Sequence, residues 1–165
     1  MSAVKKFRVK SKLSQAIGGK DGITVALALK RADEGLETIR APGVEDIDVN
    51  LAAIDARFGP GAAGRDAESL EDLYLLASRI IDVAICLQGS GIDLAARALC
   101  DLVDLSETLG VRDWEAVEVH IDALKLLRTA GLAMTPAQLN HVLDGLARVT
   151  RKRVGDSKAI PSSEA

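Results

Sequence analysis

The chain has 165 residues, of which 48% are hydrophobic and only 2% are aromatic. That length suits one domain with short extensions, and the apolar content is enough to bury a core. The scarcity of aromatic side chains favours packing between helices over a β-sandwich. The net charge of −3 is unevenly distributed, because residues 1–20 carry six basic and no acidic side chains. The acidic remainder of the chain argues against nucleic-acid binding.

Residues 1–20 are predicted to form a basic flexible arm. No apolar run approaches the roughly 18–20 residues of a membrane span, and no signal-type apolar segment follows the basic N-terminus. We therefore expect a cytoplasmic protein without a membrane span.

Two narrow apolar stripes follow the arm and predict helices over residues 24–40 and 44–57. Their spacings of four and three residues are typical of coiled-coil seams. Pro42 and Gly43 separate the stripes. Since proline disrupts a helix interior, we expect a helical hairpin or a sharply bent helix pair within residues 21–58. The stripes comprise Val25, Leu29, Ala32, Leu36 and Ile39, then Val44, Ile47, Leu51, Ile54 and Phe58.

After a glycine-rich linker at residues 59–68, four amphipathic stretches indicate four more helices. They are expected over residues 69–88, 92–109, 113–130 and 135–153. Amphipathic helices joined by short loops favour an all-α, antiparallel four-helix bundle, which residues 69–153 should close on their own. Asp113 and the run Thr135-Pro136-Ala137-Gln138 supply N-terminal helix caps. Residues 154–165 are expected to form a polar tail.

The turn between the first two bundle helices resembles the signature of histidine-phosphotransfer (Hpt) domains. In that family a helix carries His-x-Leu-Lys-Gly-Ser, and its exposed imidazole is phosphorylated. The positions that fit this pattern are Leu87, Gly89, Ser90, Leu94 and Ala96. Ile85 stands at the histidine position and Gln88 at the lysine position. The resemblance therefore implies an Hpt-like bundle that has lost the residues for phosphate transfer.

Two questions stay open at this turn. The run Gly89-Ser90-Gly91 between two helices can also be a plain connection without functional meaning. Ile85 flanks the main apolar stripe of its helix, so it is either a partly exposed interface residue or an ordinary core residue.

A second resemblance covers more of the chain. It rests on Lys10-Ser11-Lys12-Leu13, Gly22-Ile23-Thr24-Val25-Ala26, the helix pair at 73–110, Trp114-Glu115-Ala116-Val117, His120-Ile121-Asp122-Ala123-Leu124 and Leu127-Arg128. In this order these segments resemble the CheE-type accessory proteins of chemotaxis gene clusters in α-proteobacteria. The resemblance implies a small cytoplasmic protein that works beside the chemotaxis kinase and its response regulators. It brings no established catalytic residues.

The chain holds two histidines and two cysteines. His120 lies at the edge of the apolar stripe of its helix and is expected to be structural, with a relocated phosphoacceptor as the alternative. His141 is expected to be exposed. Cys86 and Cys100 fall in apolar helical patterns, as reduced core thiols do. Their spacing with the histidines resembles no zinc motif, so we expect no metal site and no cofactor.

These patterns predict a protein-interaction module in two-component or chemotaxis signalling, without catalytic activity. It would bind a receiver domain or a kinase through Ile85, Gln88 and Gly89 without accepting phosphate. One alternative is an active histidine phosphotransferase that uses His120. Another is a structural homo-oligomer that pairs through residues 24–58.

Overall fold

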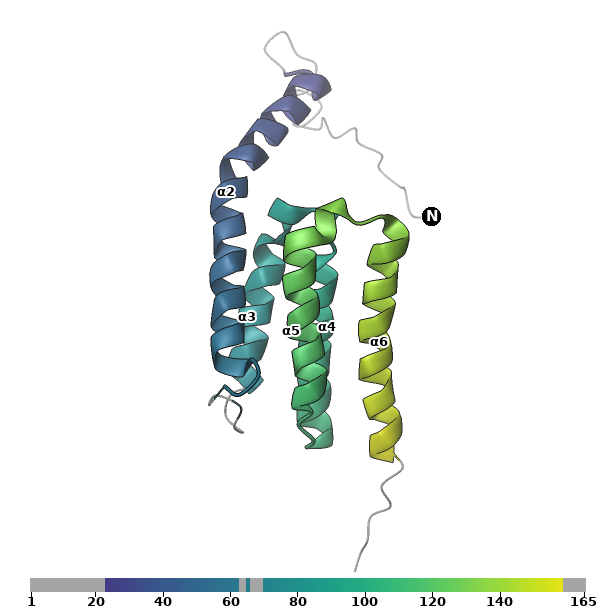
Figure 1. Ribbon diagram of the computed structural model, residues 1–165. Coiled ribbons are helices and arrows are strands. Elements are labelled where there is room, and N and C mark those ends of the chain that lie inside the picture. Colours follow the sequence, from purple (N-terminus) through teal and green to yellow (C-terminus); the bar gives the residue numbers. More distant parts are fainter. Residues whose placement is uncertain (1–22, 63–64, 66–69, 159–165) are drawn as a thin grey trace, which may run out of the picture. The chain divides into compact units, whose positions relative to one another are not determined.

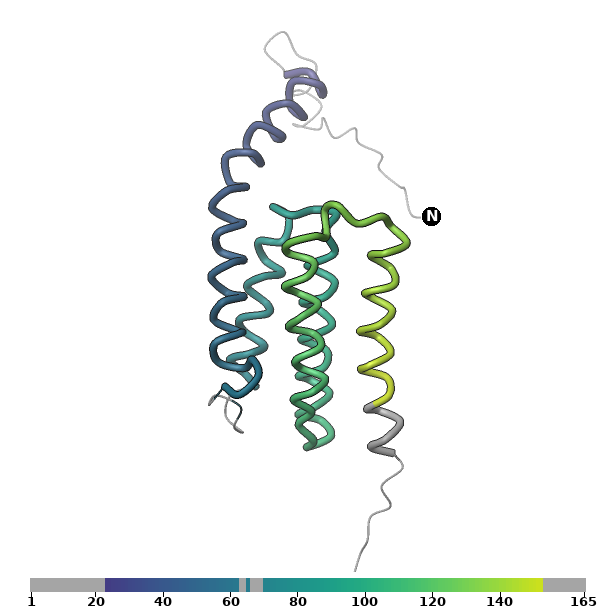
Figure 2. The backbone as a smooth tube through the Cα atoms, in the orientation of Figure 1, coloured from purple at the N-terminus to yellow at the C-terminus, as the bar shows by residue number. Residues whose placement is uncertain are grey.

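The computed structural model describes residues 23–62, 65 and 70–158, and the regular elements in this part of the chain are all helices (Figures 1 and 2). They are α2 (Val25–Phe58), α3 (Leu70–Val83), η2 (Ala84–Leu87), α4 (Ile92–Leu109), α5 (Trp114–Ala130), η3 (Gly131–Ala133) and α6 (Pro136–Lys158), where η marks 3₁₀ helix. The all-α prediction is confirmed. The predicted arm at residues 1–20 lies outside the described residues, as does the end of the predicted tail.

Helix α2 runs without interruption from Val25 to Phe58, so the predicted hairpin is wrong. Pro42 lies inside this helix and lacks only the amide that would donate to the carbonyl of Thr38. Gly43 is a packing position and not a helix breaker, because a Cβ there would lie 2.2 Å from Sγ of Cys86. This close contact and the burial of later residues in α2 hold the helix together beyond the proline.

The chain divides into two compact units, residues 1–39 and residues 40–165, which we describe separately. The boundary falls shortly before Pro42, where the helix lacks a backbone hydrogen bond. Residues 23–39 of the first unit carry the first predicted stripe. The second unit holds the hydrophobic core.

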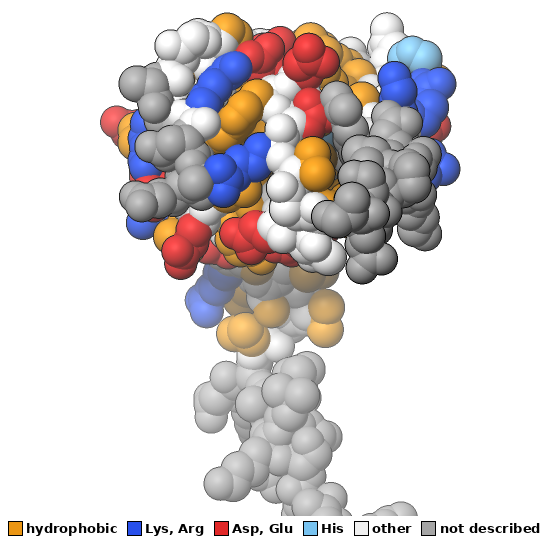
Figure 3. Space-filling model, turned by 90° about the horizontal axis from the view of Figure 1, so that it is seen from below, with side chains coloured by type: hydrophobic (Ala, Val, Ile, Leu, Met, Phe, Trp, Pro, Cys, Tyr) orange, Lys and Arg blue, Asp and Glu red, His pale blue; other side chains and the backbone are white. Residues whose placement is uncertain are grey.

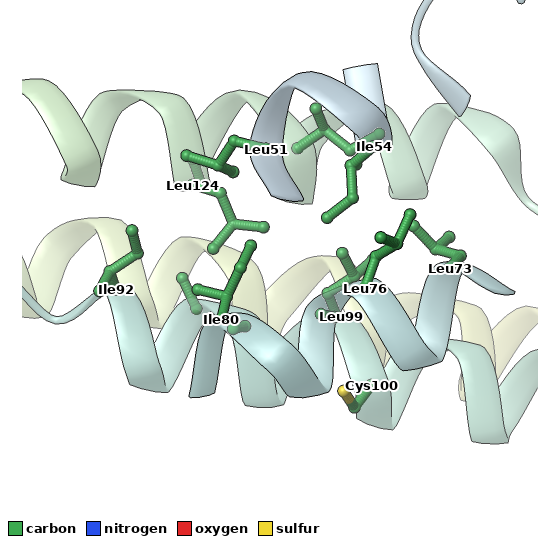
Figure 4. Packing of buried hydrophobic residues seen from close by; sticks show 14 of the residues in the cluster. Leu51, Ile54, Leu73, Leu76, Ile80, Ile92, Leu99, Cys100 and Leu124 are labelled. Atoms are coloured by element: carbon green, nitrogen blue, oxygen red, sulfur yellow. The ribbon is translucent and has the colours of Figure 1, made fainter. Parts of the chain in front are cut away.

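The core of the second unit includes the later part of α2. Four of its side chains are at most 7% exposed and pack in one cluster with buried residues of α3, α4 and α5: Ile47, Leu51, Ile54 and Phe58. Figure 4 shows Leu51 and Ile54 among side chains of α3 and α5. Helix α6 contributes less: within residues 136–152, where the structure describes side chains, Leu146 is the buried residue. Residues 69–153 therefore do not enclose this core on their own, because α2 forms one of its walls.

Ion pairs connect this part of α2 to its neighbours. They join Arg128 to Asp48, Lys125 to Asp55 and Arg57 to Asp72. The Arg128 guanidinium holds the Asp48 carboxylate with two hydrogen bonds of 2.6 and 2.8 Å. Each pair is partly exposed and contributes little by itself, and each joins α2 to α3 or α5. Figure 3 shows one end of the molecule, where acidic and basic side chains are interspersed with apolar ones.

Arg65 lies inside the predicted linker at residues 59–68 and is tied to the bundle. Its Nε donates to the carbonyls of Phe58 and Gly59 at 3.2 and 3.0 Å, and its guanidinium pairs with Glu118. The same guanidinium lies 5.7 Å from the ring centroid of Trp114, a cation–π contact. The connection is therefore anchored at this residue.

Several predicted helix ends are confirmed at the level of single atoms. The Asp113 carboxylate accepts a hydrogen bond of 3.1 Å from the amide of Ala116 and caps α5. The amide of Gln138 donates to the Thr135 hydroxyl at 3.3 Å, and the amide of Thr135 donates to the Gln138 side chain at 2.9 Å. This reciprocal pair is a capping box. Two ends differ, since α3 stops at Val83 and α6 continues to Lys158.

Candidate interaction surface around Ile85

The segment that carries Ile85 is not α-helical. Helix α3 ends at Val83 and continues as the 3₁₀ helix η2 up to Leu87. Because a 3₁₀ helix has three residues per turn, residues three apart lie on one side of it. Ala84 and Leu87 face the core in this way, and Ile85 points to the solvent with 50% of its surface exposed. The open question about Ile85 is thereby answered in favour of exposure.

The residues after η2 form a tight turn that requires glycine. Gly89 has a φ of 90° and Gly91 a φ of 73°, a left-handed region that side chains disfavour. A Cβ at Gly91 would lie 2.5 Å from Cδ1 of Leu139, so α6 also packs closely here. Ser90 is buried, and its hydroxyl accepts a 3.3 Å hydrogen bond from the amide of Ile92. Turn geometry alone therefore accounts for the Gly-Ser-Gly sequence.

Gly89 differs from Gly91 in its surroundings. No atom lies within 4 Å of the place where its Cβ would be, so the space above Gly89 is open. A neighbouring backbone or side chain can approach the turn closely at this point.

Ile85, Gln88 and Gly89 line one surface depression of about 260 Å³. The remaining lining residues are Ile81, Ala84, Asp93 and Arg97. The depression thus combines a half-exposed isoleucine, an amide, an open glycine and one charge of each sign. The structure brings together the three residues that the sequence analysis singled out. Sequence reasoning missed Asp93 and Arg97, although both fall in the first turns of the helix that follows the motif.

His120 is completely buried in the core. Its Nδ1 lies 2.7 Å from the carbonyl oxygen of Ala116, which can only accept, so Nδ1 carries the proton. Its Nε2 is buried and has no hydrogen-bond partner among the described residues. Burial lowers the pKa of His120. A phosphoryl donor cannot reach this imidazole in the folded conformation, whereas His141 is exposed as predicted.

Both cysteines are buried, as expected of core thiols. Cys86 packs against the backbone of Gly43. Cys100 lies 3.9 Å from the Ser78 hydroxyl, and burial raises the pKa of its thiol. In the part of the chain that the structure describes, no group of three or more His, Cys, Asp or Glu residues is arranged to hold a metal ion. None of the helices described is long and apolar enough to cross a membrane.

Fold and surface together define this chain as an all-α protein with a mixed apolar and polar depression beside a glycine turn. Comparison with protein-family models, curated proteins and solved structures finds no match for this chain.

Proposed function

We propose that this protein is a non-catalytic interaction module of two-component or chemotaxis signalling. It binds a receiver domain or a kinase through the depression around Ile85, Gln88 and Gly89, and it accepts no phosphate there. The observation that carries the proposal is the half-exposed Ile85 beside the open space above Gly89.

The chemistry of the depression supports a protein partner. A single exposed isoleucine is ordinary on a protein surface. Here, however, it lines a hollow together with Gln88, Asp93 and Arg97, which supply an amide, a carboxylate and a guanidinium. Protein–protein contacts combine apolar and polar groups in this way. The open glycine lets the partner approach without a clash.

The same residues argue against phosphate transfer at this surface. An isoleucine side chain has no nucleophile, and a glutamine carries no charge to attract a phosphoryl group. The chain's buried histidine, His120, is closed to an incoming receiver domain. On this proposal the surface binds its partner but lacks the groups for the phosphate transfer that the Hpt family performs.

The test compares Ile85→Asp with the matched variant Leu126→Asp, since Leu126 is 44% exposed on α5 and does not line the depression. Binding is measured by calorimetry against purified receiver domains and chemotaxis kinases. We expect Ile85→Asp to weaken binding at least tenfold and to leave the thermal midpoint within a few degrees. Leu126→Asp should change neither.

Two results would contradict the proposal. One is equal binding by wild type and Ile85→Asp. The other is acid-labile phosphate on this protein after incubation with a phosphorylated receiver domain, with loss of the label in His120→Gln. The second result would support the phosphotransferase alternative.

A further inference from the structure

The glycine turn after η2 is connected directly to the depression. Gly89 lines the depression, and the backbone hydrogen bonds of the turn run back into η2. The amide of Gln88 donates to the carbonyl of Ile85 at 3.3 Å, and the amide of Ser90 donates to the carbonyl of Leu87 at 3.0 Å. A displacement of the turn would therefore move the residues of the proposed interaction surface.

The connection from α5 to α6 packs against this turn at the same end of the bundle (Figure 1). A Cβ on Gly131, the first residue of η3, would lie 2.5 Å from the carbonyl oxygen of Ser90. Leu139, in the first turn of α6, lies equally close on another side, because a Cβ on Gly91 would be 2.5 Å from its Cδ1. Neither Gly131 nor Leu139 lines the depression.

A turn with two glycines in left-handed conformations needs such support. Gly89 and Gly91 both have positive φ, and glycine loses more conformational freedom on folding than any other residue. A surface that is ordered before its partner arrives binds at a lower cost in entropy. The contact of Leu139 with Gly91 supplies this order from outside the surface.

We propose that Leu139 and Gly131 are positioning residues for the interaction surface. They hold the glycine turn in the conformation that leaves the depression around Ile85, Gln88 and Gly89 open to a partner. The effect on binding rests on the proposed function, whereas the conformation of the turn can be measured without a partner. Leu139 is the residue to test, because it makes its contact through a side chain.

Helix α6 offers a matched control for Leu139. Leu143 lies one helical turn further along α6 and, like Leu139, is partly buried against the core. It lines a different depression together with Leu94 and Ala98, whereas the atoms closest to a Cβ on Gly91 all belong to Leu139. Leu143→Ala therefore removes packing from α6 without removing the contact with the turn.

Hydrogen exchange of the full chain, measured by NMR at the buried amide of Ser90, tests the turn without a partner. We expect Leu139→Ala to speed this exchange about tenfold, because local opening frees the hydrogen bond to Leu87. Leu139→Met, which keeps the side-chain volume, should retain the wild-type rate. Leu143→Ala should also lower the thermal midpoint but leave the Ser90 amide protected. Equal acceleration by both alanine variants, or by neither, would overturn the positioning role.

Calorimetry with a purified receiver domain that binds the wild type tests the effect on the surface. Leu139→Ala should weaken binding about fivefold by disordering the turn, and Leu139→Met and Leu143→Ala should bind as the wild type does. If Ile85→Asp weakens binding and Leu139→Ala does not, the positioning role is wrong and the proposed function stands. If Ile85→Asp binds as the wild type does, the proposed function is overturned. The exchange of the Ser90 amide then decides by itself whether Leu139 holds the turn.

Discussion

His120 places a titratable imidazole in the core, and only one of its two ring nitrogens has a hydrogen-bond partner among the described residues. Its Nδ1 donates to the carbonyl of Ala116, and its Nε2 faces no partner among the described residues. A charged imidazolium here would lose its hydration and would have no acceptor for its Nε2–H, so burial lowers the pKa of His120 although the hydrogen bond to Ala116 opposes this shift. The sequence pattern placed this residue at the edge of the stripe, whereas the fold encloses it completely.

The buried histidine makes stability depend on pH just below neutrality. Above pH 6.5 the imidazole is neutral in both the folded and the unfolded chain, so it adds no pH dependence. Below pH 6.5 the unfolded chain takes up the proton first, and the free energy of unfolding falls by at most about 1.4 kcal/mol per pH unit. We expect urea midpoints to drop between pH 7.5 and 5.5 in the wild type.

The matched variants for this effect are His120→Gln and His141→Gln, since His141 is exposed. His120→Gln should flatten the pH dependence, and His141→Gln should retain it. A flat profile in the wild type, or flattening by His141→Gln alone, would refute the assignment.

Helix α2 contains Pro42 and Gly43, which were predicted to interrupt it. The two residues have different roles in the helix. Pro42 removes one hydrogen bond, and the two compact units divide shortly before it. Gly43 packs against Cys86, because no other residue leaves room for the sulfur atom. The local preference of a Pro-Gly pair for a turn is overridden here by the tertiary contact between Gly43 and Cys86.

Substitution of Gly43 tests this role. Alanine is the better helix former, so Gly43→Ala would stabilise an exposed helix by roughly 1 kcal/mol. At this site the new Cβ would lie 2.2 Å from Sγ of Cys86, and we expect a loss of about 1–3 kcal/mol in chemical denaturation. Gly145→Ala in α6 is the control, since no atom lies within 4 Å of its Cβ position, and it should be stabilising.

A second variant separates the packing clash from other causes. Adding Cys86→Ala to Gly43→Ala removes the sulfur atom and should recover part of the lost stability. If Gly43→Ala is as stabilising as Gly145→Ala, the close contact with Cys86 is absent in solution.

At the scale of the whole molecule, the core depends on contacts between segments far apart in the sequence. Asp48 and Arg128 are 80 residues apart, and Asp55 and Lys125 are 70 residues apart. Phe58 at the end of α2 stacks on Trp114 at the start of α5, with ring centroids 6.4 Å apart. The part of α2 from residue 40 onward is therefore an integral helix of the bundle.

This dependence predicts how truncation acts. A chain of residues 40–158 should unfold cooperatively, whereas a chain of residues 66–158 should lose cooperative thermal unfolding, because the side chains that α2 covers become exposed. In the full chain, Ile54→Ala should cost about 2–5 kcal/mol, since Ile54 is 0% exposed. Val49→Ala, at a 62% exposed position of the same helix, should cost little. Cooperative unfolding of residues 66–158 would contradict this account.

The sequence alone determined the features that depend on neighbours within one helical turn. The caps at Asp113 and Thr135 and the start and end of the helix Ile92–Leu109 agree with the structure. Capping and turn chemistry involve side chains and amides three or four residues apart, so a local pattern contains the necessary information. The same holds for the glycine turn at residues 89–91.

Only the tertiary structure decided which stripes are covered and by what. The two stripes of α2 have the same spacing, yet Ile54 is buried and Leu29 is 61% exposed. Ile85 lies outside the core because α3 tightens into η2 one residue before it. Burial depends on side chains that arrive from distant parts of the chain. Identical local patterns can therefore have opposite environments, and periodicity cannot distinguish them.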